Sequence, residues 1–190
     1  CDVECRDEGM LARVQDYINQ HPQGDILLVL HQMGNHGPAY YKRYPPQFEQ
    51  FKPACQTNQL EQCSKAEIDN AYDNAILYTD YFLSKVIELL ERNEGAFEAA
   101  LLYVSDHGES LGENGIYLHG LPNWMAPDTQ RQVPAILWFS PSFDETDRPT
   151  LLQNRNQPYS HDHIFHTILG LLEIESAIYN PQLDIRQHGL

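Results

Sequence analysis

The residue pair with the clearest chemical potential in this sequence is Asp106-His107, which Gly108 follows directly. A carboxylate oxygen and a neutral imidazole nitrogen are both good zinc ligands. Successive side chains of a strand point to opposite faces, so adjacent ligands need a turn to reach one ion, and a glycine permits that turn. The alternative is an ordinary turn in which the histidine is hydrogen-bonded and binds no metal. The other histidine-rich stretches favour the first interpretation.

Two more histidines lie in glycine-rich loops. His36 belongs to the loop HQMGNHGP, which comes directly after the apolar run Ile26–Leu30, and His119 is followed by another glycine. The Asp-His pair likewise follows an apolar run, Leu101–Val104. In open α/β sheets, ligands collect at the carboxyl ends of the strands. We therefore expect His36 and His119 to converge with the Asp-His pair in one cleft.

Alternating helices and short apolar strands must position these loops. The longest helix begins at a capping box formed by Ser64 and Glu67. Apolar periodicity predicts helices over Gly9–Gln20, Lys65–Arg92 and Ser160–Leu172, and buried strands over Ile26–Leu30, Ala99–Val104 and Val133–Phe139. This alternation predicts a layered α/β/α fold with a mainly parallel sheet. Three strands are few for such a sheet, so we expect residues 1–190 to form the C-terminal portion of one larger domain, incomplete at its N-terminal side.

Composition and charge restrict the kind of partner. The chain has 190 residues, about the length of one domain, and a formal net charge of −15. This charge argues against nucleic acid as a partner, because the phosphate backbone requires Lys and Arg. The longest apolar runs are too short to cross a bilayer.

Four cysteines occur, and none has histidines nearby at zinc-finger spacing. Cys55 and Cys63 bracket a short polar loop, so a local disulfide is the simplest interpretation, and Cys1 and Cys5 could form another. Such disulfides indicate an oxidising compartment. The alternative is four reduced, buried thiols in a cytosolic protein.

Several other polar residues near these motifs receive structural interpretations. His31 points either into the core or towards the site. We expect Glu109 and Glu113 to be solvated loop carboxylates, with support of a ligand histidine as the alternative. A structural role near a helix start is expected for His161, His163 and His166.

The stretch Val104–Pro122, VSDHGESLGENGIYLHGLP, resembles the signature of the lipid A phosphoethanolamine transferases of the EptA and MCR type. The loop His31–Tyr44, HQMGNHGPAYYKRY, is similar to the other histidine loop of these enzymes, and Tyr72-Asp73-Asn74 to part of their long helix. The similarity extends from Cys5-Arg6-Asp7 to the helix at His161-Asp162. It implies a fold of the sulfatase-like alkaline phosphatase superfamily.

The resemblance also implies roles for individual residues. Asp106 and His107 match ligands of a catalytic zinc ion, and His36 and His119 match histidines that contact the phosphoethanolamine group or a second zinc. The implied reaction is zinc-dependent transfer of phosphoethanolamine from phosphatidylethanolamine to a lipid A phosphate, on the periplasmic side of a bacterial inner membrane. Such enzymes confer polymyxin resistance. The pair of Cys55 and Cys63 matches one of the family's disulfides.

The family's nucleophilic threonine, a glutamate zinc ligand and the transmembrane helices all precede the region that this chain matches. We therefore expect no nucleophile and an incomplete zinc site in this chain, membrane attachment through the missing N-terminal helices, and no activity of the chain alone. Two alternatives remain. One is another sulfatase-like phosphotransferase or hydrolase of the same superfamily, and the other is a non-catalytic fragment that binds a headgroup.

Overall fold

The computed structural model describes residues 5–143 and 148–187, which fall into two compact units. The first unit comprises Cys1–Arg92 and Tyr103–Ile136, and the second comprises Asn93–Leu102 and Leu137–Leu190. The helices are α1 (Val14–Gln20), α2 (Lys65–Arg92), α3 (Asp128–Arg131), α4 (Arg148–Asn154) and α5 (Asp162–Leu171). The strands are β1 (Ala100–Val104), β2 (Ser110–Leu111), β3 (Tyr117–Leu118) and β4 (Ala135–Phe139).

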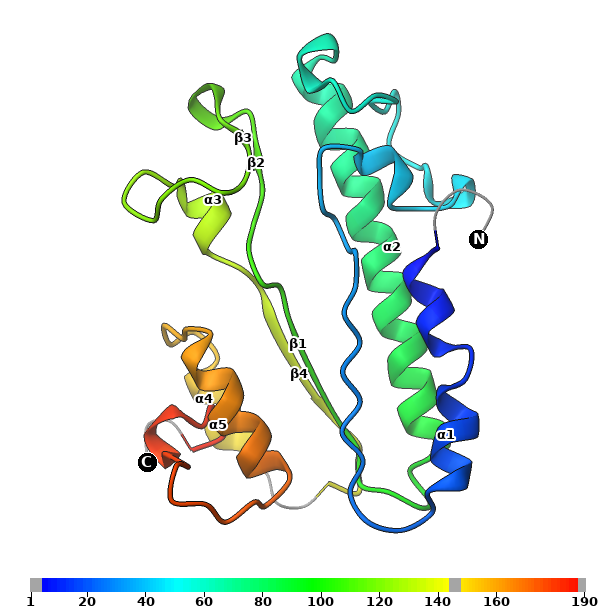
Figure 1. Cartoon of the computed structure of the whole chain (residues 1–190), viewed down its shortest axis with the longest axis vertical. Helices are drawn as coiled ribbons and strands as arrows, with labels where there is room; N and C mark the ends of the chain where they lie inside the picture. Colours follow the sequence, from blue (N-terminus) through cyan, green and yellow to red (C-terminus); the bar gives the residue numbers. More distant parts are fainter. Residues whose placement is uncertain (1–4, 144–147, 188–190) are drawn as a thin grey trace. The chain divides into compact units, whose positions relative to one another are not determined.

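Helix α2 is the longest helix of the first unit and is continuous in Figure 1. The predicted capping box is confirmed, because the Ser64 amide donates to the Glu67 carboxylate at 2.7 Å and the Glu67 amide donates to Ser64 Oγ at 3.3 Å. One face of the helix is buried along its whole length, as the apolar spacing predicts. Its buried residues are Ile68, Ala71, Asn74, Ala75, Tyr78, Thr79, Phe82, Val86 and Leu89.

The proline-rich segment that follows the first histidine loop packs against this buried face. Asn74, which is fully buried, accepts hydrogen bonds from the backbone amides of Gln50 and Phe51 at 2.8 and 2.9 Å. Its amide nitrogen donates to the Phe51 carbonyl at 2.9 Å. Two short 3-10 turns, Tyr40–Lys42 and Pro46–Phe48, are the regular structure of this segment.

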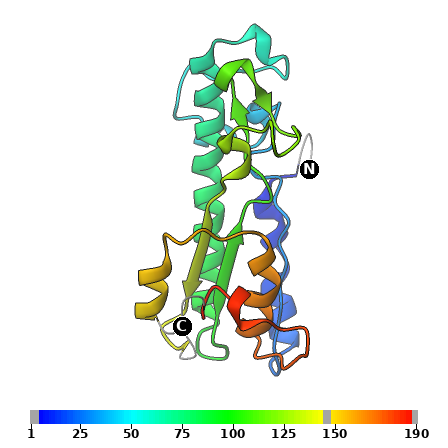
Figure 2. The ribbon, with the colours of Figure 1, turned by 90° about the vertical axis from the view of Figure 1, so that its left-hand side faces the viewer.

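The strands form two small pairs within the described residues. β1 pairs with β4, and β2 pairs with β3 as an antiparallel hairpin (Figure 2). Hydrogen bonds flank the β1–β4 pair, from the Ser140 amide to the Ala99 carbonyl and from the Gly108 amide to the Gln130 carbonyl, so these two strands run in opposite directions. The parallel neighbours expected for β1 are therefore not found in the described part of the chain.

The strand predicted over Ile26–Leu30 is not formed in this structure. These residues are extended but carry no strand assignment, and the side chains of Leu27 and Val29 are 56% and 80% exposed. A strand needs a hydrogen-bonded neighbour, and among the described residues none pairs with this segment. The predicted helix over Gly9–Gln20 is also corrected, because a 3-10 turn, Asp7–Leu11, precedes the shorter α1.

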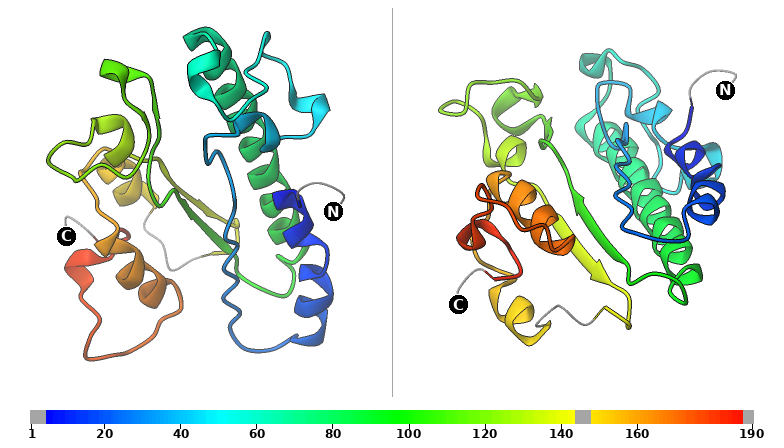
Figure 3. Two further views of the ribbon diagram at one scale, coloured as in Figure 1. Left: turned by 45° about the horizontal axis from the view of Figure 1, so that its top comes forward. Right: turned by 60° about the horizontal axis from the view of Figure 1, so that its bottom comes forward.

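The second unit is built around α5, beside which the C-terminal segment (red) folds back in Figure 3. Asp184 is fully buried and pairs with the Arg186 guanidinium at 2.9 Å. The Ile185 amide donates to Thr167 Oγ1 of α5 at 3.1 Å. A Cβ on Gly170 would lie 2.1 Å from the Asp184 carboxylate, so a larger residue there would displace the ion pair.

No helix in the described ranges is long and apolar enough to span a membrane.

Candidate functional site

The loop that carries His36 is held in place by side chains from two other elements of the first unit. The Asp7 carboxylate accepts a hydrogen bond from the Gly34 amide of the loop at 3.0 Å. Thr79 of α2 donates to the Asn35 side chain at 2.7 Å. These contacts fix the backbone on the N-terminal side of His36. Sequence reasoning did not assign Asp7 and Thr79 to the site, because neither type of contact has a local sequence signal.

The backbone after His107 is fixed by a close approach to the segment around α3. The Gly108 amide donates to the Gln130 carbonyl at 3.0 Å. A Cβ at Gly108 would lie 2.0 Å from the Thr129 carbonyl oxygen, which excludes any other residue without a shift of the backbone. The glycine that the sequence suggested as a turn residue is thus required for close packing.

His119 is brought back to the same place by the β2–β3 hairpin. In its register Ser110 pairs with Leu118, so His119 lies one step beyond the pair and next to Glu109. The His119 Nδ1 is 3.1 Å from Glu109 Oε1.

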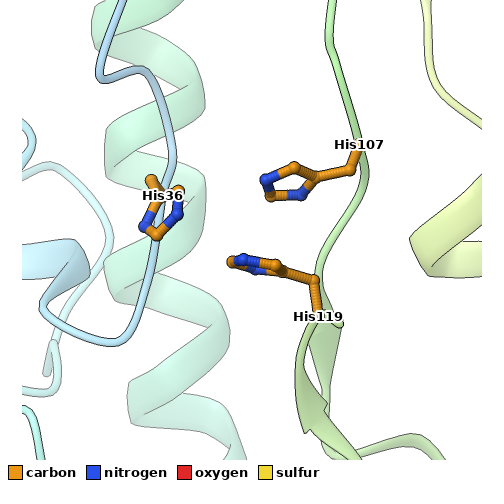
Figure 4. Close-up of side chains that lie close together, drawn as sticks. All are labelled: His36, His107 and His119. Carbon is orange, nitrogen blue, oxygen red and sulfur yellow. The ribbon is translucent and has the colours of Figure 1, made fainter. Parts of the chain in front are cut away.

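The structure brings His36, His107 and His119 together, although they come from distant parts of the sequence (Figure 4). Each offers a ring nitrogen, and these nitrogens all lie within 4.8 Å of one another. The ring centroids of His107 and His119 are 3.9 Å apart, and those of His36 and His119 are 4.8 Å apart. The side chains of His107 and His119 are each 30% exposed, so the group is reachable from solvent.

The hydrogen bonds of the three imidazoles determine which nitrogen is available. Nδ1 of His36 bonds to the Gly37 carbonyl at 2.8 Å, and Nδ1 of His107 bonds to the Gly108 carbonyl at 3.0 Å. Carbonyl and carboxylate oxygens can only accept, so Nδ1 carries the proton in these bonds and in that of His119. In the neutral imidazole, Nε2 then presents a lone pair. Three such lone pairs suit a metal ion or a hydrogen-bond donor.

Asp106 lies beside this group and outside the set of three histidines. Its side chain is 79% exposed, and its Oδ1 is 3.9 Å from His107 Nε2, close enough for both groups to contact one ion. The same Oδ1 accepts from the His107 amide at 3.0 Å. Burial and the Asp106 carboxylate raise the pKa of the Tyr103 hydroxyl, so this tyrosine remains a neutral neighbour.

Glu109 is buried, which corrects the expectation of a solvated carboxylate. Its side chain is 4% exposed and accepts from the Gly37 amide at 3.0 Å and from the Tyr40 hydroxyl at 3.2 Å, besides His119. Burial and the Glu109 carboxylate raise the pKa of Tyr40 well above its ordinary value, so Tyr40 remains a donor. Glu113 instead accepts from the Leu111 amide at 2.8 Å, within the hairpin.

Among the described residues, the other histidines lie outside this group. His31 is exposed. His163 is buried, and its Nδ1 accepts from the Ser160 amide at 3.1 Å at the start of α5. Nδ1 of His166 accepts from the Asn180 amide at 3.1 Å, which agrees with the structural role expected for these two residues.

A disulfide joins Cys55 and Cys63, whose Cα atoms are 5.8 Å apart. Cys55 is buried in the core beside α2. The pairing suggested for Cys1 and Cys5 involves Cys1, which lies outside the described residues.

This combination of an α/β chain and a histidine site agrees with the family comparison. The chain matches the sulfatase family over residues 2–174 and belongs to that family. It is 48% identical over 188 residues to phosphoethanolamine transferase EptA of Escherichia coli K12, covering 97% of this chain and 34% of the relative. It is 50% identical over 174 residues to phosphatidylethanolamine transferase Mcr-2 of E. coli, covering 92% and 31%. A more distant relative, 34% identical over 170 residues, is the Kdo(2)-lipid A phosphoethanolamine 7''-transferase of E. coli K12, with 86% and 29% covered.

Solved structures confirm the sulfatase-like fold class. The soluble domain of lipooligosaccharide phosphoethanolamine transferase A from Neisseria meningitidis has a TM-score of 0.91 and 43% identity, with 97% of this chain and 56% of that chain covered. The C-terminal periplasmic domain of EptC from Campylobacter jejuni has a TM-score of 0.86 and 41% identity, with 97% and 58% covered. The corresponding E. coli EptC domain in complex with Zn shares the fold at 22% identity and a TM-score of 0.72, with 99% and 53% covered. The chain spans about a third of the length of the curated relatives that it matches.

Proposed function

We propose that this chain is the C-terminal portion of one sulfatase-like catalytic domain, and that the full-length protein transfers phosphoethanolamine from phosphatidylethanolamine to a lipid A phosphate. The observation that carries the proposal is the convergence of His36, His107 and His119. The names of the relatives supply the reaction, since they are phosphoethanolamine and phosphatidylethanolamine transferases, one of them acting on lipid A.

The donor set of the site fits zinc. Imidazole nitrogens and a carboxylate oxygen are the ligands that zinc takes in catalytic sites, and the Nδ1 bonds leave each Nε2 free to ligate. We propose that Asp106 and His107 hold the catalytic zinc. A bound zinc ion would polarise a phosphoryl oxygen and lower the pKa of a hydroxyl nucleophile.

His36 and His119 are proposed to contact the phosphoethanolamine group or to hold a second zinc. A protonated imidazole would donate Nε2–H to a phosphate oxygen, whereas a neutral one would offer its Nε2 lone pair to a metal. Both rings approach within 5.7 Å of His107, measured between centroids, so one phosphoryl group can reach all three.

We expect the nucleophile, a threonine in the family that the sequence resembles, and a glutamate zinc ligand to lie outside this chain. The threonine oxygen would bond to phosphorus as the phosphorus–oxygen bond to diacylglycerol breaks, and the diacylglycerol oxygen would take the threonine proton. A lipid A phosphate oxygen would then bond to phosphorus as the bond to threonine breaks, and the threonine oxygen would take a proton from the attacking phosphate group. The isolated chain is therefore expected to be inactive.

The proposed location is the periplasmic face of the bacterial inner membrane, with attachment through helices outside this chain. The Cys55–Cys63 disulfide supports an oxidising compartment, and solved relatives are periplasmic domains. Adding an ethanolamine ammonium to lipid A would reduce its negative charge. Cationic polymyxin should then bind less tightly, which is the proposed basis of resistance.

The test is transfer by the full-length protein, measured by mass spectrometry of lipid A after incubation with phosphatidylethanolamine vesicles. We expect transfer by the wild type and its loss in Asp106→Ala and His107→Ala. His21→Ala is the matched control, because the His21 side chain is exposed and its contacts are with the Tyr17 carbonyl and ring, away from the histidine group. Hydrolysis of phosphate or sulfate esters without transfer to lipid A would favour another sulfatase-like enzyme and contradict the proposal.

A further inference from the structure

Glu109 occupies a position that its neighbours in the sequence do not explain. Its carboxylate contacts both the loop that carries His36 and the segment that carries His119. Its Oε1 accepts from the Gly37 amide at 3.0 Å and from His119 Nδ1 at 3.1 Å, and its Oε2 accepts from the Tyr40 hydroxyl at 3.2 Å. The side chain is 4% exposed, so water contributes little to this arrangement.

Stability alone does not account for a buried carboxylate of this kind. Burying a charge is costly unless it is paired and hydrogen-bonded, and an apolar side chain of similar size is often at least as stable. Among the described residues, no lysine or arginine forms an ion pair with Glu109, and the ionisable group that contacts it is the His119 imidazole at 3.1 Å. Its contacts are instead three donors that belong to, or adjoin, the histidine site.

We propose that Glu109 is the positioning residue of the site, setting the tautomer of His119 and the backbone on which His36 is held. This inference rests on the proposed function only for the reaction that the site serves. Glu109 Oε1 accepts from the Gly37 amide and is also the acceptor for His119, so His119 donates from Nδ1 and presents Nε2 to the other two rings. The tautomer follows from the contact itself.

The same carboxylate reaches His36 through a single residue. Glu109 accepts from the Gly37 amide, and the Gly37 carbonyl in turn accepts from Nδ1 of His36 at 2.8 Å. Gly37 is closely packed, because an added Cβ would lie 2.6 Å from the Leu118 side chain and 2.7 Å from the Tyr40 hydroxyl. A displacement of Glu109 is therefore passed to both imidazoles.

Tyr40 holds the other oxygen of Glu109 against the core. Its ring is 1% exposed and packs in the cluster with Cys55, Leu60 and Ile68. Its hydroxyl stays protonated, as its raised pKa requires, and so donates at every ordinary pH. The carboxylate is thus fixed by the hydrophobic core at one end and orients the histidines at the other.

The test uses the full-length protein with ¹⁵N-labelled histidine, free of metal, and reads the tautomer of His119 from its two ring nitrogen signals. We expect Nδ1 protonated and Nε2 unprotonated in the wild type. In Glu109→Met, which keeps a similar volume and removes the acceptor, we expect mixed tautomers at His119. Zinc affinity, titrated with zinc chloride alone, should fall about 10–100-fold.

Glu109→Gln should restore both readouts, because its amide oxygen can still accept from Gly37 and His119. Glu113→Gln is the matched control, a carboxylate on the same hairpin that bonds only to a backbone amide, and should change neither readout. A wild-type His119 protonated on Nε2 would overturn the inference without any variant, and so would unchanged tautomer and zinc affinity in Glu109→Met. Neither readout depends on transfer activity, so failure of the proposed reaction and failure of this inference are distinguishable.

Discussion

Gly108 tests most directly how the fold positions the site, because a single added methyl group meets a backbone atom. A Cβ at Gly108 would lie 2.0 Å from the Thr129 carbonyl oxygen, and real Cβ atoms essentially never approach closer than 3.0 Å. In Gly108→Ala the two backbone segments must separate, and Thr129 has no flexible side-chain end at that contact to absorb the movement. Nδ1 of the His107 ring bonds to the carbonyl of the displaced residue at 3.0 Å, so the ring would move with it.

The magnitude follows from this displacement. Overpacking of this type costs about 1–3 kcal/mol in stability. A misplacement of about 1 Å at a reacting group can cost about 100-fold in rate, so we expect transfer to fall by roughly that factor. The larger effect should be on the rate, because the contact lies next to the site and outside the main core.

The assay compares Gly108→Ala with Gly95→Ala in the full-length protein, measuring lipid A transfer and the thermal midpoint. Gly95 is the matched control, since an added Cβ there meets nothing within 4 Å. Transfer rates and midpoints that are equal in the two variants would refute the reasoning that the close approach at Gly108 fixes His107.

Three further changes have expected outcomes. Because the pKa of Tyr40 is raised above its ordinary value of 10.0, its contribution to stability is complete below pH 10 and is lost as the pH rises above it, when only the unfolded state releases the proton. Tyr40→Phe should lower stability at pH 7 and flatten the alkaline decline in thermal midpoint; an unchanged slope would contradict this. Asp184→Ala leaves the Arg186 guanidinium buried and unpaired, and should lower the free energy of unfolding, measured by chemical denaturation, by about 3–5 kcal/mol. An unchanged free energy of unfolding would contradict this expectation. Replacing Cys55 and Cys63 by serine should cost roughly 2–3 kcal/mol, and a reducing agent should then have no further effect on this loop.

Much of the local structure could be predicted from the sequence because its causes are local. The bounds of α2 follow from the Ser64–Glu67 capping box and from apolar residues repeated at helical spacing. The three histidines that converge could also be selected from the sequence, because each lies in a glycine-containing loop and two of these loops follow apolar runs directly. Side-chain chemistry is a property of the residues themselves.

The tertiary structure decided what depends on distant partners. Ile26–Leu30 has the composition of a strand but no hydrogen-bonded neighbour among the described residues, so it stays extended and exposed. The sequence suggested that Glu109 is a solvated loop carboxylate, but the side chain is buried. The β2–β3 register places it next to His119, and the loop at Gly37 packs against its other side. His36 meets His119 only because both loops are fixed to separate parts of the first unit, and no local pattern specifies a contact across 83 positions. Burial and convergence arise from packing between segments, which the spacing of residues along one segment does not encode.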